Sequence, residues 1–319
     1  MLIEKAKTEY LLCRIPGLVV TERGSLIGYY ECRRSDSDWA DIDIKVIRST
    51  DDGENFETVC VIPSNGNTLN NPMMIVKGED IHFLYHKNYK QLLYSKSCDD
   101  GLTFSEPIDI SEVFEDGGFF YNVAAIGPGH GIVHDGTIIM PVWFAYNEKD
   151  KYEHHPSFIS TLYSEDDGKS WKLGEIIGKD VLTDPSECAL AVTADNRVLI
   201  SIRNENACRQ RAFAISDNGF SNWEDLHFNP DMPDPICQGS MCSAEGKIFH
   251  INCAHDSERV NLTIKTSDNN FESFDCISVD EIGGYSDIAE KDGTLYILYE
   301  RDPWNDGLYF KKVIKYKFK

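Results

Sequence analysis

One eight-residue pattern occurs three times in this chain and constrains its fold more than any other feature. The copies are residues 49–56 (STDDGENF), 97–104 (SCDDGLTF) and 164–171 (SEDDGKSW). A repeat spaced at tens of residues indicates supersecondary units that pack side by side. Within each copy, Asp-Asp-Gly supplies residues that tolerate a positive φ, which is typical of a β-hairpin turn, and the final aromatic residue can anchor that turn to a core.

Two weaker copies of the pattern follow. Residues 216–219 read SDNG and lead to Trp223, and residues 267–270 read SDNN and lead to Phe274. The five copies start at residues 49, 97, 164, 216 and 267, so they are 48, 67, 52 and 51 residues apart. This spacing predicts four-stranded β units with one insertion between the second and third copies.

Short β-strand patterns dominate the rest of the chain. Segments rich in β-branched and aromatic residues, bounded by Gly, Asp or Asn, include residues 43–48, 81–86, 197–203 and 294–300. No segment sustains a helical period over several turns, although residues 110–115 fit a single turn. These patterns predict an all-β fold.

A ring of such units must close on itself if no sheet edge is to stay unpaired. The C-terminal run at residues 308–316 and the N-terminal segment at residues 10–13 both have strand character, and we expect them to pair in one unit. No linker-like Gly/Ser or Pro run divides the chain. We therefore expect residues 1–319 to form a single catalytic domain.

The composition restricts the possible partners. The net charge is −22, from 31 Lys and Arg against 53 Asp and Glu, which disfavours nucleic acid or an anionic membrane as a partner. No apolar run approaches the length of a membrane span, so no membrane insertion is expected. The N-terminal residues MLIEKAKT lack the apolar core of a signal peptide. This favours a cytoplasmic location, or secretion if a leader has been removed.

The ten cysteines contain no C-x-x-C pair and no Cys/His cluster at zinc spacing. Most of them lie within apolar strand-like runs, where buried free thiols are expected. The Asp residues of the repeat are interpreted as turn-forming groups and not as metal ligands. The sequence therefore predicts no metal and no cofactor.

The repeat resembles the Asp-box of sialidase-type β-propellers, S-x-D-x-G-x-[ST]-[WF], and a second set of residues resembles the site of the sialidase family. Arg14 opens an R-I-P motif like the one that supplies the first arginine of the family's carboxylate-binding triad. Residues 26–33 (LIGYYECR) are similar to the strand that follows, with its E-x-R continuation. Glu187, with Arg203 16 residues later, is similar to the family's glutamate segment and its next arginine.

Further matches follow in the family's order. Arg259, just ahead of the last Asp-box, fits the third arginine of the triad. Tyr285 opens a segment similar to the family's Y-S-x-L…D-G-x-x-x-L-L-Y-E close, and Asn71-Pro72 is a further match. The matches run from residue 14 to about residue 300, which is nearly the whole chain.

The resemblance implies a six-bladed β-propeller that acts as a retaining exo-α-sialidase on terminal sialic acids of glycans. It implies that Tyr285 is the nucleophile, that Glu187 is its base partner, and that Arg14, Arg203 and Arg259 bind the substrate carboxylate. Asn71 is a further candidate for substrate binding. The substrate partner would be a sialylated glycan or a free sialoside.

Each of these residue types suits the chemistry. A sialic acid carries a carboxylate on its anomeric carbon, and guanidinium groups give that carboxylate bidentate, charge-assisted hydrogen bonds. The same carboxylate would repel an Asp or Glu nucleophile, whereas a tyrosine is uncharged. A phenol with an ordinary pKa near ~10 needs an adjacent carboxylate to accept its proton, which is the role of Glu187.

The acid that protonates the leaving oxygen is expected within residues 33–43, which contain four aspartates. The distance from Arg14 favours Asp38, 24 residues on, and Asp41 is the alternative and otherwise a substrate-binding candidate. Arg33 is interpreted either as a substrate-binding residue or as a structural charge. Trp39 is either an aromatic wall over the acetamido group or a support for its loop.

Other functions stay open at this point. A glycan-binding propeller without activity is expected to lack Tyr285, Glu187 or the acid, and this chain has all three. A propeller acting on another acidic sugar, such as Kdn or a uronic acid, would keep the arginines and change the acetamido pocket, which the sequence does not locate. Transfer of the sugar instead of its hydrolysis is a third possibility. His154 and His155 are interpreted as a polar stretch of the insertion, of the kind that often borders a propeller's pocket.

Overall fold

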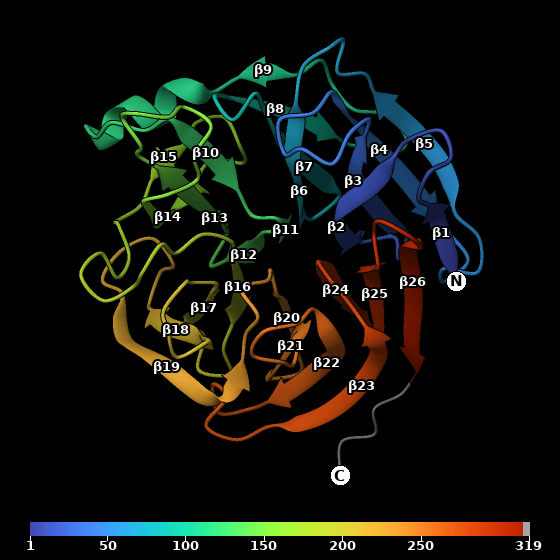
Figure 1. The fold of residues 1–319 in the computed structure, drawn as a ribbon. Helices are drawn as coiled ribbons and strands as arrows, with labels where there is room; N and C mark the ends of the chain where they lie inside the picture. The colour runs from blue at the N-terminus through green and yellow to red at the C-terminus, as the bar shows by residue number, and fades with distance from the viewer. Residues whose placement is uncertain (315–319) are drawn as a thin grey trace.

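Six small sheets stand around a central axis in the computed structural model, which describes residues 1–314 (Figure 1). Blade 1 contains β2 (Leu12–Val20), β3 (Leu26–Arg33), β4 (Ile42–Ser49) and β5 (Glu57–Ile62). Blade 2 contains β6 (Leu69–Lys77), β7 (Asp80–Lys87), β8 (Gln91–Ser97) and β9 (Ile108–Asp109), and β11 (Gly129–His130) pairs with β6. Blade 3 contains β10 (Val123–Ile126), β13 (Thr137–Ala145), β14 (Ser157–Ser164) and β15 (Lys172–Leu173), and β12 (Ile132–His134) pairs with β13.

The second half of the chain completes the ring. Blade 4 contains β16 (Cys188–Val192), β17 (Val198–Ile202), β18 (Gln210–Ser216) and β19 (Glu224–Pro233). Blade 5 contains β20 (Ser240–Ala244), β21 (Lys247–Cys253), β22 (Val260–Ser267) and β23 (Asp275–Ile282). Blade 6 contains β24 (Ser286–Lys291), β25 (Thr294–Arg301), β26 (Gly307–Ile314) and β1 (Leu2–Lys5). The six-bladed β-propeller expected from the sequence is confirmed.

The hydrophobic core lies in layers between neighbouring blades. One cluster joins Met73 and Leu84 of blade 2 to Met140 and Phe144 of blade 3, and equivalent clusters fill the other gaps. The inner and second strands are therefore buried on both faces, and every residue of β3 is buried. This explains why these strands read as continuous apolar runs and do not alternate between apolar and polar residues.

The Asp-boxes form the turns between the third and fourth strands of blades 1 to 5. In the third copy the Ser164 hydroxyl donates to Asp166 Oδ1 (2.9 Å) and accepts the backbone N–H of Gly168 (2.9 Å), while Asp166 accepts the N–H of Ser170 (2.8 Å). Asn218 and Asn269 accept the equivalent backbone N–H groups in the two weaker copies, which is why these turns form without the aspartate.

Blade 6 has no Asp-box because its fourth strand comes from the other end of the chain. β1 pairs antiparallel with β26, with Leu2 opposite Tyr309 and Lys5 opposite Gly307. The predicted partner of the C-terminal strand, residues 10–13, is wrong: this segment leads into β2, the inner strand of blade 1. Residues 315 and 316 of the expected C-terminal run lie outside the described residues.

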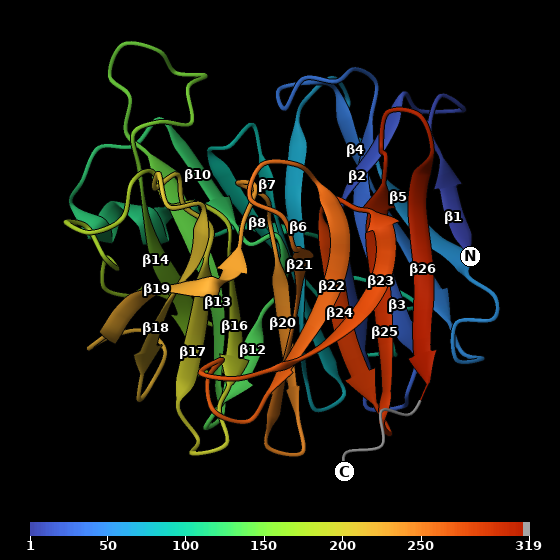
Figure 2. The ribbon, with the colours of Figure 1, turned by 60° about the horizontal axis from the view of Figure 1, so that its bottom comes forward.

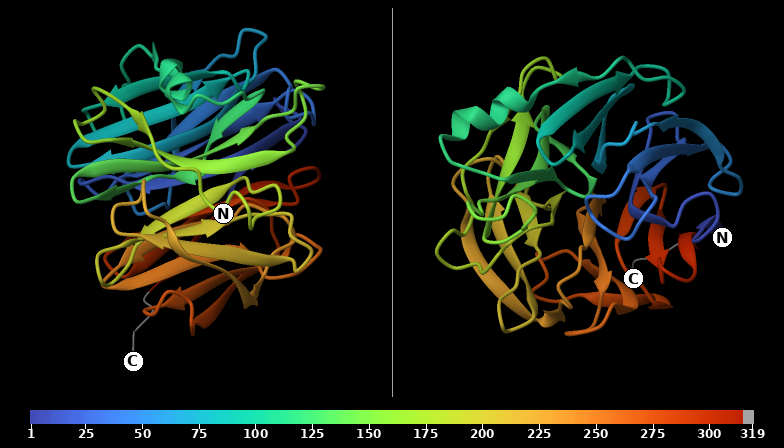
Figure 3. Two further views of the ribbon diagram at one scale, coloured as in Figure 1. Left: turned by 90° about the vertical axis from the view of Figure 1, so that its left-hand side faces the viewer. Right: turned by 45° about the horizontal axis from the view of Figure 1, so that its top comes forward.

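The long spacing between the second and third Asp-boxes contains η1 (Ser111–Gly117), β10 to β12, and the loop between β13 and β14. The single helical turn expected at residues 110–115 is present as this 3-10 helix, which lies on the outer edge of the ring (Figure 3). Figure 2 shows the β13–β14 loop rising above the neighbouring loops of its face. Within the described part of the chain, no helix has the length and apolar character needed to span a membrane.

We predict that Ser164→Ala lowers the free energy of unfolding by about 1–3 kcal/mol, because the buried N–H of Gly168 loses its acceptor. Urea denaturation followed by circular dichroism measures this change. Ser170→Ala removes an exposed hydroxyl from the same turn and serves as the matched control, with a smaller expected cost. Equal stabilities of the wild type and Ser164→Ala would contradict the structural role of the Asp-box.

Candidate active site

A pocket of about 170 Å³ opens at one end of the ring. It brings together eight of the nine residues that the sequence predicted for the site: Arg14, Arg33, Asp38, Asn71, Glu187, Arg203, Arg259 and Tyr285. They lie at or just before the starts of inner strands, at the ends of the second strands β3 and β17, and in loops between second and third strands. All of these positions are at the same face of a four-stranded blade. The Asp-box turns connect third and fourth strands and thus lie at the opposite face.

The three arginines of the predicted triad enter the pocket from three blades. Arg14 lies on β2 of blade 1, Arg203 follows β17 of blade 4, and Arg259 precedes β22 of blade 5. A bulge directly after Arg14 shifts the register of β2, and Ile15 there has a φ of 57°. This conformation is costly for a β-branched residue. The N–H of Ile15 donates to the buried Glu300 carboxylate (3.0 Å), which helps to hold the bulge.

Tyr285 and Glu187 form a hydrogen-bonded pair at the centre of the pocket. The phenol donates to Glu187 Oε1 at 2.6 Å, and Arg203 Nη1 donates to the phenol oxygen at 2.8 Å and also pairs with Glu187. Burial raises the pKa of the Tyr285 phenol, the Arg203 guanidinium opposes this rise, and the Glu187 carboxylate adds to it. Tyr285 therefore keeps its proton at neutral pH, and an acceptor for that proton is already in contact.

Glu300 is a supporting residue that the sequence analysis did not assign. Its carboxylate accepts hydrogen bonds from Arg14 Nε (3.0 Å) and Nη2 (3.3 Å), and from the backbone N–H of Tyr285 (3.2 Å). Arg14 and Arg259 also lie over the ring of Tyr285, with their guanidinium carbons 5.0 and 5.3 Å from its centroid. One buried carboxylate thus orients the first arginine and the loop that carries the tyrosine. The only signal for it in the sequence was the Tyr-Glu pair at the end of the Tyr285 segment.

Asp38 lies in the β3–β4 loop with its side chain 48% exposed, and it accepts a hydrogen bond from Arg33 Nη1 (2.7 Å). Arg33 is fully buried and also donates through Nε to Glu31 (2.7 Å). Glu31 in turn accepts the backbone N–H of Asn71 (2.8 Å). Burial alone would raise the pKa of Asp38, but the charge and hydrogen bond of Arg33, together with the electrostatic effects of Arg14 and His154, outweigh it, so the pKa lies below its usual range.

The structure corrects the expectation for Asp41, which lies outside the pocket. Its carboxylate accepts hydrogen bonds from Arg34 Nη1 (3.2 Å) and from the hydroxyl of Ser64. Asp41 immediately precedes β4 and turns toward the loop that follows β5, whereas Asp38 turns toward the axis. Trp39 is a support for the loop: its ring packs against Tyr89 (4.7 Å between centroids) and Tyr152 (5.0 Å) and does not line the pocket.

Six further residues complete the wall of the pocket: Ile15, Tyr89, Trp143, His154, His155 and Ser186. The ring of His154 lies 5.3 Å from each of Trp143 and Tyr89, between centroids. Burial lowers the pKa of His154, so this imidazole is neutral at pH 7. The long insertion was the sequence signal for these histidines, and the structure brings them to the pocket.

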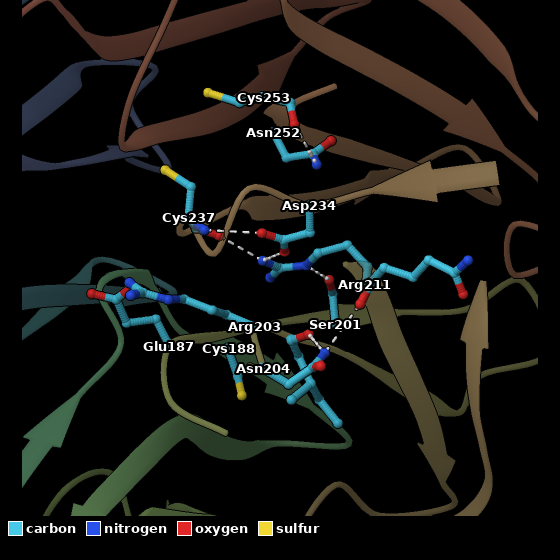
Figure 4. A network of polar contacts seen from close by, with 12 residues as sticks. Glu187, Cys188, Ser201, Arg203, Asn204, Arg211, Asp234, Cys237, Asn252 and Cys253 are labelled. Atoms are coloured by element: carbon cyan, nitrogen blue, oxygen red, sulfur yellow. Dashed lines mark hydrogen bonds and ion pairs between the residues drawn. The ribbon is translucent and has the colours of Figure 1, made fainter. Parts of the chain in front are cut away.

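Behind the pocket, a buried network supports the loops of blades 4 and 5 (Figure 4). Arg211 donates to Asp234 Oδ2 (2.6 Å), to the carbonyl of Cys237 (2.8 Å) and to the hydroxyl of Ser201 (3.1 Å). Arg211 is fully buried and does not line the pocket, in agreement with a structural role. Across the described residues, no group of three or more His, Cys, Asp or Glu side chains has the geometry of a metal site.

The structure thus places this chain in the class of six-bladed β-propellers whose pocket is lined by arginines and contains a tyrosine–glutamate pair. The comparisons with known proteins name the family: residues 57–297 match the BNR repeat-like domain, and the chain belongs to that family.

Similar curated proteins include a sialidase of Bacteroides fragilis, 28% identical over 297 residues, which cover 80% of this chain and 52% of that protein. A sialidase of Paraclostridium sordellii is 25% identical over 367 residues, covering 95% of this chain and 84% of that protein. The chain thus spans about half the length of the Bacteroides fragilis sialidase.

Solved structures share the fold over nearly the whole chain. A Hadza microbial sialidase superposes with a TM-score of 0.80 and 24% identity, covering 95% of this chain and 66% of that one. The intramolecular trans-sialidase from Ruminococcus gnavus superposes with a TM-score of 0.77 and 15% identity, covering 97% and 96%.

We predict that Glu300→Gln lowers the free energy of unfolding by about 3–5 kcal/mol, because removal of one partner leaves the buried Arg14 charge uncompensated. Chemical denaturation measures the loss. Asp41→Asn changes a half-exposed carboxylate outside the pocket and is the matched control, with an expected change below about 1 kcal/mol. A Glu300→Gln protein as stable as its control would show that Glu300 does not hold Arg14.

Proposed function

We propose that this protein is a retaining exo-α-sialidase that hydrolyses terminal sialic acids from glycans through a covalent tyrosyl intermediate. One observation carries the proposal: the Tyr285 phenol donates to Glu187 at 2.6 Å in a pocket that three arginines enter from different blades. The sialidases among its relatives support the assignment.

The arginines account for the recognition of the substrate. A sialic acid is an anion at neutral pH, and its carboxylate is attached to the carbon at which the glycosidic bond breaks. Arg14 and Arg259 stack over Tyr285 and Arg203 donates to its phenol, so a carboxylate bound by these groups places the anomeric carbon close to the phenol oxygen. The protein thereby positions the reacting carbon through the charge next to it.

The first step forms the covalent intermediate. The Tyr285 oxygen attacks the anomeric carbon while its proton passes to Glu187 Oε1, the atom that already accepts it. The glycosidic bond breaks, and the leaving oxygen takes a proton from Asp38. A neutral nucleophile avoids repulsion by the substrate carboxylate, and Glu187 prevents a free phenolate from having to form first.

The second step reverses these proton transfers. Asp38, now a carboxylate, removes a proton from a water molecule that attacks the anomeric carbon. The bond from the sugar to the tyrosine breaks, and Glu187 returns the proton to the phenol oxygen. Each step inverts the anomeric centre, so the overall reaction retains its configuration.

One observation separates this proposal from a binding-only propeller, and an assay separates it from action on another acidic sugar. A non-catalytic glycan-binding propeller has no need of a buried phenol joined to a carboxylate, and this pair is present. A structural neighbour, the Trypanosoma rangeli sialidase, is known in complex with a difluoro analogue of KDN, so assays should offer fluorogenic N-acetylneuraminide and Kdn substrates side by side. If the protein hydrolyses neither of these substrates, that result argues against the proposed activity.

We predict that Tyr285→Phe abolishes the covalent adduct that the wild-type enzyme forms with a 2,3-difluoro sialoside, since the substitution removes only the nucleophilic oxygen. Mass spectrometry of the intact protein and of its peptides detects the adduct. Unchanged circular dichroism and melting temperature would show that the variant is folded. A label on any residue other than Tyr285 would overturn the assignment of the nucleophile.

We predict that Asp38→Ala lowers kcat/KM on natural sialosides by about 10²–10⁴-fold, because the leaving oxygen loses its acid. A fluorogenic substrate with an acidic leaving group needs little protonation and should lose far less activity. Asp41→Asn, outside the pocket, is the control and should resemble the wild type on both substrates. Equal losses on the two substrate types would remove the acid role from Asp38.

A further inference from the structure

The pocket has equal numbers of arginines and carboxylates, but these groups are not all paired one to one. Four arginines and four carboxylates line or directly support it: Arg14, Arg33, Arg203, Arg259, Glu31, Asp38, Glu187 and Glu300. Without substrate the formal charges of these eight groups cancel. Any additional anion therefore leaves the pocket with an excess negative charge.

The eight groups divide into two sets that differ in net charge. In the first set, Arg14 pairs with Glu300 and Arg203 pairs with Glu187, whereas no carboxylate of the described residues lies within ion-pair distance of Arg259. This set has one positive charge in excess. In the second set, Arg33 pairs with both Glu31 and Asp38, which leaves one negative charge in excess.

In the free pocket these two excesses compensate each other. Arg14 belongs to the positive set, and its charge also contributes to keeping the pKa of Asp38 low. A substrate carboxylate bound by the three arginines cancels the positive excess. The negative excess at Arg33 is then left without compensation in a partly desolvated site, where charge interactions are strong.

Asp38 is the carboxylate best placed to receive a proton. Both oxygens of Glu187, of Glu300 and of Glu31 accept hydrogen bonds from arginine, tyrosine or backbone groups. Of the described residues, only Arg33 donates to Asp38, through one bond to Oδ1. Its Oδ2 is therefore available, and the half-exposed side chain gives solvent access to it.

We propose that binding of the anionic substrate transfers one proton from solvent to Asp38. Substrate binding thereby protonates the group that then acts as the general acid. The proton leaves a buffer acid or hydronium ion and forms the O–H bond at Asp38 Oδ2. This inference rests on the proposed function and deepens it. It explains how a carboxyl group that is ionised in the free enzyme becomes a proton donor once substrate is present.

Other groups face Asp38 and are included in the test. They are Arg33 and Glu31 on β3, Arg14 on β2, Tyr89 in the β7–β8 turn and His154 in the β13–β14 loop. His154 is neutral in the free pocket and is the principal rival for the proton. The experiment therefore has to identify the group that takes up the proton.

The experiment measures proton uptake when 2-deoxy-2,3-dehydro-N-acetylneuraminic acid, an anionic analogue that is not hydrolysed, binds the full chain. Calorimetric titrations at one pH in buffers of different ionisation enthalpy give the number of protons taken up. At a pH between the pKa of Asp38 in the free protein and its raised pKa in the complex, we expect about one proton per ligand in the wild type and a Kd that rises about tenfold per pH unit. Asp38→Asn should bind the analogue with almost no uptake and a flat pH dependence. Asp41→Asn, the matched control, should behave as the wild type.

Glu31→Gln provides an independent check of the charge argument. It removes the negative excess at Arg33 while Asp38 stays in place, so uptake should fall although the acid is still present. Tight binding by the wild type without proton uptake would overturn the inference and leave the proposed function intact. Uptake that persists in Asp38→Asn would place the proton on His154 or Glu31 and would also overturn it. Failure of the wild type to bind the analogue at all would count against the proposed function.

Discussion

The ion pair between Arg14 and Glu300 is the interaction on which the organisation of the site depends. The two residues are 286 positions apart and belong to the first and the last blade of the ring. They meet because the closed ring places β2 of blade 1 beside β24 and β25 of blade 6. Closure of the ring thus stabilises the sheet edges and also completes the pocket, since the same glutamate holds the bulge at Ile15 and the backbone of Tyr285.

The topology of the blades places the stabilising Asp-box turns and the pocket at opposite faces of the ring. In a four-stranded antiparallel blade, the connections between third and fourth strands emerge at the face opposite to those between second and third strands. The Asp-box turns occupy the first of these faces, and the pocket occupies the second. Turns of similar sequence can therefore recur in five blades while the blades contribute different side chains to the site.

The pocket holds many charges at close range without an unpaired carboxylate in its interior. Buried charges are expensive unless they are paired, and here Glu31, Glu187 and Glu300 each contact an arginine. Arg259 is the exception among the arginines, since its guanidinium stacks on Tyr285 and has no carboxylate partner among the described residues. That arrangement leaves one cationic group free for an anion, which is the basis of the proposed link between the charge of a ligand and the protonation of Asp38.

Local and non-local interactions set the limit of what the sequence could determine. The Asp-box turns were recognisable because their hydrogen bonds join residues two to four positions apart, as from Ser164 to Gly168, so the pattern contains all of the partners. The arginines, Glu187 and Tyr285 were recognised by their resemblance to a family, and the structure brings them into one pocket.

Only the tertiary structure decided the rest. It showed that residues 2–5, and not residues 10–13, close the ring, because strand pairing across the whole chain depends on the path of the backbone. It separated Asp38 from Asp41, which are three residues apart in one loop but turn toward different neighbours. It also brought Glu300 and His154 to the site. Contacts between residues far apart in the sequence leave no local sequence pattern. The residues that make such contacts can therefore be identified only from the closed ring.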